Sequence, residues 1–121
     1  MSMITSTILV VDDEESIRNL VRTKLMREGR RVFEAARGQE AVEMFRRQRP
    51  DITILDLHLP GMNGVEVLKQ IRAIDPQAIV MIFTGVASEA AVKEITRLGV
   101  TEVLQKGSSL PAIGETPQLQ R

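Results

Sequence analysis

The chain has 121 residues, a length typical of one domain that buries roughly two-thirds of its unfolded surface without covalent cross-links. It contains no cysteine, which excludes disulfides and thiolate metal sites and is compatible with a reducing cytosol. Its 16 basic and 16 acidic residues cancel, so we expect no direct nucleic acid binding by this segment, and any charge-dependent function must be local.

Five short apolar runs alternate with amphipathic segments along the chain. The runs are TILVV (7–11), VFEA (32–35), ITIL (52–55), AIVMIF (78–83) and VTEVL (100–104). They have the length and the branched residues typical of strands, and three of them lack alternation, as do strands covered on both faces. All are far shorter than the roughly 20 apolar residues that cross a bilayer, and the N-terminus does not resemble a secretion signal. We therefore expect a cytoplasmic protein with no membrane contact.

Apolar residues at helical spacing occupy the segments between these runs. The four predicted helical faces comprise Ile17, Leu20, Val21 and Leu25; Ala41, Met44 and Phe45; Val67, Leu68, Ile71 and Ile74; and Ala91, Val92, Ile95 and Leu98. Glycine or proline follows each face and ends the helix. The resulting βαβαβαβαβ order predicts an α/β domain, with a doubly wound five-stranded parallel sheet and right-handed crossovers.

Polar residues follow or lie close behind four of the predicted strands. Asp12 and Asp13 follow the first strand, Asp56 the third and Thr84 the fourth, while Lys106 lies just past the fifth. Ligands of an open parallel sheet bind outside the carboxyl ends of its strands, so these residues should share one rim. Each alone could be a helix cap, a turn residue or a surface charge. Their occurrence at four strand ends favours a functional site.

The residue types on this rim indicate phosphate chemistry. Three neighbouring carboxylates repel one another and favour a bound cation, and a set of oxygen ligands is typical of Mg²⁺. Lys106 and the Thr84 hydroxyl could donate hydrogen bonds to phosphate oxygens. A carboxylate can also accept a phosphoryl group as an aspartyl phosphate. Asp56 is the predicted nucleophile because it stands alone on a central strand, opposite the acidic pair.

Four motifs resemble the receiver domain of bacterial two-component response regulators. They are ILVVDDEESIRNLV (8–21), DITILDLHLPGMNGVEVLKQIR (51–72), IVMIFTG (79–85) and LGVTEVLQKG (98–107). The resemblance covers roughly residues 7–107 and implies a flavodoxin-like fold with strand order 2-1-3-4-5. It also implies a receiver domain over residues 1–107, followed by an atypical tail over 108–121.

The resemblance assigns a role to each rim residue. The implied Mg²⁺ ligands are Asp12, Asp13, Asp56 and the backbone carbonyl of His58. Asp56 would accept a phosphoryl group from a sensor histidine kinase or phosphotransfer protein, and Thr84 and Lys106 would contact that group. The domain would then change conformation and signal to a partner or an output domain. Such a domain is not an ordinary enzyme, although it assists its own phosphorylation and dephosphorylation.

Three features depart from the family pattern. Val103 stands where an aromatic residue usually rotates inward, and Gly107 replaces the proline that usually follows the lysine. In the 108–121 tail, an early glycine and proline allow at most one or two helical turns near 110–114, where a long fifth helix is usual. Because a short or missing helix would uncover apolar sheet, a homodimer is among the expected assemblies.

Two other functions fit part of the pattern. A Mg²⁺-dependent aspartyl-phosphate phosphatase resembling the haloacid dehalogenases would need a general acid two residues after Asp56, where this chain has His58, and a cap insertion that it lacks. A non-phosphorylated interaction module would be expected to have lost an acid or the lysine, and none is lost. His58, the sole histidine, is expected to be a rim residue that at most modulates the access of water.

Overall fold

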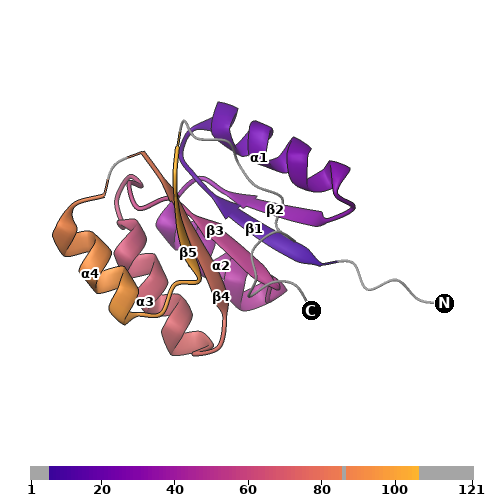
Figure 1. Cartoon of the computed structure of the whole chain (residues 1–121). Coiled ribbons are helices and arrows are strands. Elements are labelled where there is room, and N and C mark those ends of the chain that lie inside the picture. The colour runs from indigo at the N-terminus through magenta and orange to yellow at the C-terminus, as the bar shows by residue number, and fades with distance from the viewer. Residues whose placement is uncertain (1–5, 86, 107–121) are drawn as a thin grey trace.

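The structure is a computed structural model that describes residues 6–85 and 87–106. Its elements in chain order are β1 (Thr7–Val11), α1 (Glu15–Arg27), β2 (Arg31–Ala35), α2 (Gly38–Gln48), β3 (Ile52–Leu55), α3 (Gly64–Ile74), β4 (Ile79–Thr84), α4 (Glu89–Arg97) and β5 (Glu102–Gln105) (Figure 1). All five predicted strands are present, and their ends differ from the predicted ones by at most two residues. Within the described ranges, no helix is both long and apolar enough to cross a bilayer.

The strands form one parallel sheet in the order β2-β1-β3-β4-β5, which confirms the predicted flavodoxin-like arrangement. The register aligns the carboxyl ends of the central strands, since Val11 pairs with Leu55 and Leu55 pairs with Ile82. The residues that follow β1 and β3 therefore leave the sheet side by side. This alignment places the predicted rim at one edge of the domain.

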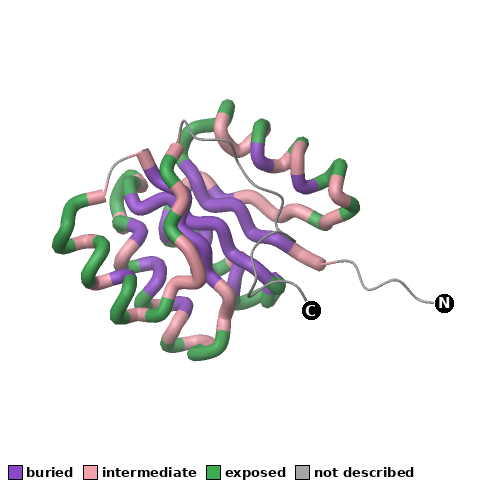
Figure 2. The backbone as a smooth tube through the Cα atoms, in the orientation of Figure 1, coloured by how far each residue is buried: buried purple, intermediate pink, exposed green. Residues whose placement is uncertain are grey.

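Helices cover both faces of the sheet (Figure 1). Leu9 and Val11 of β1 pack in a cluster with α2, α3 and α4, whereas Ile8 and Val10 pack in a second cluster with α1. The central strands are accordingly buried along almost their whole length (Figure 2). Burial on both faces explains why these strands lack polar alternation, and each fully buried Leu or Ile side chain stabilises the fold by about 1.5–3 kcal/mol.

The helix ends follow local backbone and capping chemistry. Beyond the end of α1, Gly29 adopts φ 80°, a conformation that glycine takes without a Cβ clash. The Asn63 side chain accepts a hydrogen bond from the Glu66 amide and caps α3, so the Asn-Gly pair acts as turn and cap. Ser88 caps α4 in the same way.

Two predicted core positions on the helices are wrong. Leu20 of α1 is 62% exposed and Val92 of α4 is 38% exposed. A helix that lies on a sheet buries a narrow stripe, which in α1 runs through Val21 and Leu25, so an apolar residue beside that stripe faces outward. The predictions for the tail, including the short helix near 110–114, lie outside the described residues.

Candidate functional site

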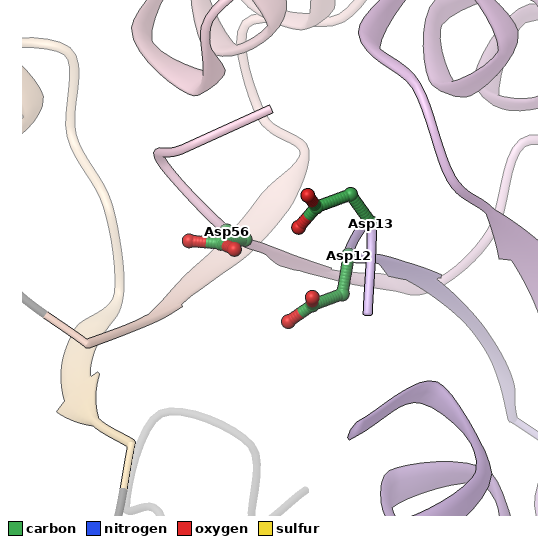
Figure 3. Close-up of side chains that lie close together, drawn as sticks. All are labelled: Asp12, Asp13 and Asp56. Carbon is green, nitrogen blue, oxygen red and sulfur yellow. The ribbon is translucent and has the colours of Figure 1, made fainter. Parts of the chain in front are cut away.

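The three predicted acidic residues converge at the ends of β1 and β3 (Figure 3). One ligand oxygen from each of Asp12, Asp13 and Asp56 lies within 4.8 Å of the others. The backbone fixes two of them, because the Asp12 amide donates to the Ala35 carbonyl at 3.1 Å and the Asp56 amide donates to the Val11 carbonyl at 3.0 Å. Asp12 and Asp56 are buried, whereas Asp13 is exposed.

Lys106 joins the acidic residues from the end of β5. Its Nζ lies 2.7 Å from Asp12 Oδ2, 3.0 Å from Asp56 Oδ2 and 3.1 Å from Glu14 Oε1. Its backbone amide donates to the carbonyl of Thr84, the last residue of β4, at 2.8 Å. An ammonium group has three N–H donors, so the three carboxylates use all of them. The lysine thereby joins Asp12 and Glu14 to Asp56, the predicted phosphoacceptor.

Burial and charge oppose each other in this cluster. Burial raises the pKa of Asp12 above its ordinary value, although hydrogen bonds from Lys106 and from the Glu14 amide act in the opposite direction. Burial also tends to lower the pKa of Lys106, but its hydrogen bonds to the carboxylates outweigh that effect, so its pKa is raised. The lysine therefore stays positively charged. Three carboxylates contact it, and a fourth, that of Asp13, lies beside two of them. The excess of negative charge favours a cation.

The donor set fits Mg²⁺. Asp12, Asp13 and Asp56 offer only oxygen ligands, at a spacing that one small ion can bridge. The backbone amide of His58 donates to Asp56 Oδ1 at 3.1 Å, and its side chain is exposed, as expected for a rim residue. The role of the His58 carbonyl as a metal ligand stays a prediction.

Two residues that shape the site were not predicted from the sequence. Glu14 was not singled out, although it follows the acidic pair directly and its side chain reaches Lys106. Gly64 was not assigned to the site either, yet a Cβ there would lie 2.4 Å from the Asp56 carbonyl oxygen and 2.5 Å from Leu57 Cα. The Asn-Gly pair is a local signal for such a glycine, but it does not reveal which backbone the glycine approaches.

A cleft of about 270 Å³ lies beside the carboxyl ends of β4 and β5. It is lined by Thr84, Gly85, Ala87, Val103, Leu104 and Gln105. Thr84 is buried, and the Val103 side chain, which is 42% exposed, stands on the edge strand where the family usually carries an aromatic residue. Any inward movement next to Thr84 would therefore occur without an aromatic side chain at position 103.

Known proteins resemble this chain in both sequence and structure. The family model described as the response regulator receiver domain matches residues 8–116. Sporulation initiation phosphotransferase F of Bacillus subtilis is 37% identical over 97 residues, which span 80% of this chain and 78% of that protein. Chemotaxis protein CheY of Halobacterium salinarum is 34% identical over 112 residues, which span 89% of this chain and 93% of that protein.

Solved structures show the same likeness. A CheY-like response regulator receiver domain protein from Methanospirillum hungatei superposes with a TM-score of 0.85 at 25% identity, covering 88% of this chain and 85% of that chain. The CheX-CheY complex with BeF3 and Mg²⁺ from Borrelia burgdorferi superposes with a TM-score of 0.82 at 28% identity, covering 88% of this chain and 81% of that chain. With strand order, acidic cluster and lysine as described above, the chain therefore belongs to the response regulator receiver domain family.

Proposed function

We propose that Asp56 accepts a phosphoryl group from a phosphohistidine of a sensor histidine kinase or phosphotransfer protein. The observation that carries this proposal is the buried Asp56 carboxylate, which lies 3.0 Å from Lys106 Nζ and within one ligand cluster with Asp12 and Asp13. A carboxylate in such a setting can act as a nucleophile, and the surrounding charges can stabilise the transferring group.

The proposed transfer is a displacement at phosphorus. A carboxylate oxygen of Asp56 forms the new P–O bond as the P–N bond to the donor histidine breaks, and the departing nitrogen keeps the electron pair. Lys106 exchanges its bond to Asp56 Oδ2 for one to a phosphoryl oxygen, and the Thr84 hydroxyl donates to another. When bound by Asp12, Asp13, Asp56 and the His58 carbonyl, Mg²⁺ would offset the charges that otherwise repel the phosphoryl oxygens.

Related proteins support the proposed partners. One relative is named a sporulation initiation phosphotransferase, and one similar structure is a complex of CheY with CheX. We propose a histidine kinase or a phosphotransfer protein as phosphodonor for this cytoplasmic domain, and a homodimer as one assembly. No direct contact with nucleic acid or membrane is required for this function.

Incubation with Mg²⁺ and acetyl phosphate tests the phosphoacceptor. We expect intact mass spectrometry to show one added phosphoryl group on the wild type and none on Asp56→Asn, because the amide is a poor nucleophile. The matched control Asp75→Asn changes an aspartate at the end of α3 and should label normally. Asp13→Ala should lose Mg²⁺-dependent labelling. Equal labelling of Asp56→Asn and wild type would contradict the proposal.

Phosphorylation should shift the start of α4 more than its end. The guanidinium of Arg72 donates to the carbonyls of Leu98 and Gly99, which anchors the end of α4 to α3. The start of α4 lies instead beside Ala87 and the cleft next to Thr84. A bound phosphoryl group can shift α4 between two conformations only through contacts that differ between them. Such contacts are available at the start of α4, beside Thr84, and not at its anchored end.

Amide hydrogen exchange with and without beryllofluoride and Mg²⁺ measures this shift. We expect altered exchange at residues 84–85 and 87–91, with smaller changes at 96–100. Asp56→Asn treated identically is the control and should show neither change. Uniform changes along α4, or none at its start, would be inconsistent with a pivot about the anchored end.

A further inference from the structure

We infer that Glu14 is a positioning residue that holds Lys106 beside Asp56, an inference that rests on the proposed phosphoacceptor function. Glu14 Oε1 accepts a hydrogen bond from Lys106 Nζ at 3.1 Å, across a sequence separation of 92 residues. The same nitrogen lies 3.0 Å from Asp56 Oδ2. Glu14 therefore contacts the same ammonium group that contacts Asp56, and it has none of the roles assigned above.

The backbone of Glu14 is held firmly enough for this role. Its amide donates to Asp12 Oδ1 at 2.9 Å, and its carbonyl accepts the Arg18 amide at 3.0 Å as the first bond of α1. The guanidinium of Arg18 also donates to the Asp12 carbonyl at 2.7 Å. The turn between β1 and α1 is thus fixed at both ends, and the Glu14 side chain extends from it to the lysine.

Glu14 differs from the other two carboxylates that contact Lys106. Asp12 and Asp56 are members of the proposed metal cluster, and Asp56 itself would carry the phosphoryl group. Their oxygens become engaged during the reaction, and their hold on the ammonium weakens. Within the described residues the cluster at metal-ligand spacing does not include Glu14, so its bond to Lys106 can persist from the free to the phosphorylated state.

This chain has a particular need for such a contact. Lys106 is followed by Gly107, where the family usually has proline, and glycine leaves the backbone its greatest conformational freedom. The hydrogen bond from the Lys106 amide to the Thr84 carbonyl holds the main chain at the amide of the residue. The Glu14 carboxylate, by contacting the ammonium group, restricts the flexible four-carbon side chain of Lys106 at its far end.

Three variants separate position from charge. Glu14→Gln removes the charge and keeps the length, whereas Glu14→Asp keeps the charge and shortens the reach to the lysine. Glu15→Gln is the matched control, because Glu15 is an exposed neighbour in the first turn of α1, with no bond to Lys106. For each protein we would measure the rate of phosphorylation by acetyl phosphate, beryllofluoride affinity, Mg²⁺ affinity and stability in urea.

We expect both Glu14 variants to lose about two- to fivefold in phosphorylation rate and beryllofluoride affinity relative to Glu15→Gln, a range typical of a partly exposed ion pair. The Mg²⁺ affinity of both Glu14 variants should equal that of Glu15→Gln, since Glu14 is not a proposed ligand. A purely structural role would instead follow stability and affect both affinities together, which would overturn the inference. A Glu14→Asp variant that behaves like the wild type would also overturn the inference, because a negative charge without the full reach to Lys106 would then be sufficient.

Failure of this inference is distinguishable from failure of the proposed function. If the wild type is phosphorylated on Asp56 and the Glu14 variants match Glu15→Gln, only the positioning role is overturned. If the wild type is not phosphorylated at all, the phosphoacceptor proposal itself fails, and the positioning role fails with it. Side-chain ammonium NMR of Lys106 gives an independent readout, since hydrogen exchange at Nζ should accelerate in both Glu14 variants.

Discussion

Gly64→Ala is expected to lower the free energy of unfolding by about 3 kcal/mol, a large loss for a domain of this size. The added methyl group would lie 2.4 Å from the Asp56 carbonyl oxygen and 2.5 Å from Leu57 Cα. Both are backbone atoms, so neither can rotate away as a side chain could. Either α3 must retreat from β3 or the segment that carries Asp56 must shift, and both changes disturb the proposed phosphoacceptor.

Urea unfolding measures this loss, and acetyl phosphate labelling measures its effect on Asp56. Gly85→Ala is the stability control, because a Cβ at Gly85 meets nothing within 4 Å. That variant should remain within about 0.5 kcal/mol of the wild type. Equal urea midpoints for Gly64→Ala and Gly85→Ala would contradict this prediction, because the backbone would then accommodate a methyl group at Gly64 without loss of stability.

Lys106→Met is expected to destabilise the metal-free protein by about 3 kcal/mol at neutral pH. The substitution leaves Asp12 and Asp56, with side chains 3% and 4% exposed, without the ammonium group between them. Removing one partner of a buried ion pair leaves the other charge uncompensated, and here two such charges also repel each other. Phosphorylation should fall as well, because no ammonium group remains for the phosphoryl oxygens.

Added Mg²⁺ should restore much of the lost stability, since a cation bound by the carboxylates replaces the missing charge. Unfolding in urea, with EDTA or with Mg²⁺, measures the gain for each protein. Lys93→Met, which alters an exposed lysine of α4, is the control and should gain no more than the wild type. A gain for Lys106→Met equal to that of Lys93→Met would mean that the lysine and the metal do not neutralise the same carboxylates.

The pH dependence of this penalty has a defined sign. Burial raises the pKa of Asp12 above its ordinary value of 3.8. When the pH lies between these two pKa values, Asp12 keeps its proton in the native state and has lost it in the unfolded state. The contribution of Asp12 to stability therefore falls as pH rises through the interval between these two pKa values. Loss of the ammonium group removes a contact that opposes this shift, so the Lys106→Met penalty should shrink as the pH is lowered.

The sequence by itself determined the elements and the chemistry of the rim. Strands covered on both faces need continuous apolar runs, and the runs at 7–11 and 52–55 coincide with β1 and β3. Because parallel strands end at one edge, the residues after them, including Asp12 and Asp56, could be placed together without coordinates. The glycines that end α1 and α4, Gly29 and Gly99, follow from equally local chemistry.

Only the tertiary structure decided which groups on the rim touch. The bond between Glu14 and Lys106 joins residues 92 positions apart, and the approach of Gly64 to Asp56 depends on how closely α3 meets β3. Helical periodicity likewise could not separate buried Val21 from exposed Leu20, which lie next to each other on α1. Sequence patterns report the period and direction of side chains within an element, whereas contacts depend on the distance and rotation between elements, which the packing of the whole domain sets.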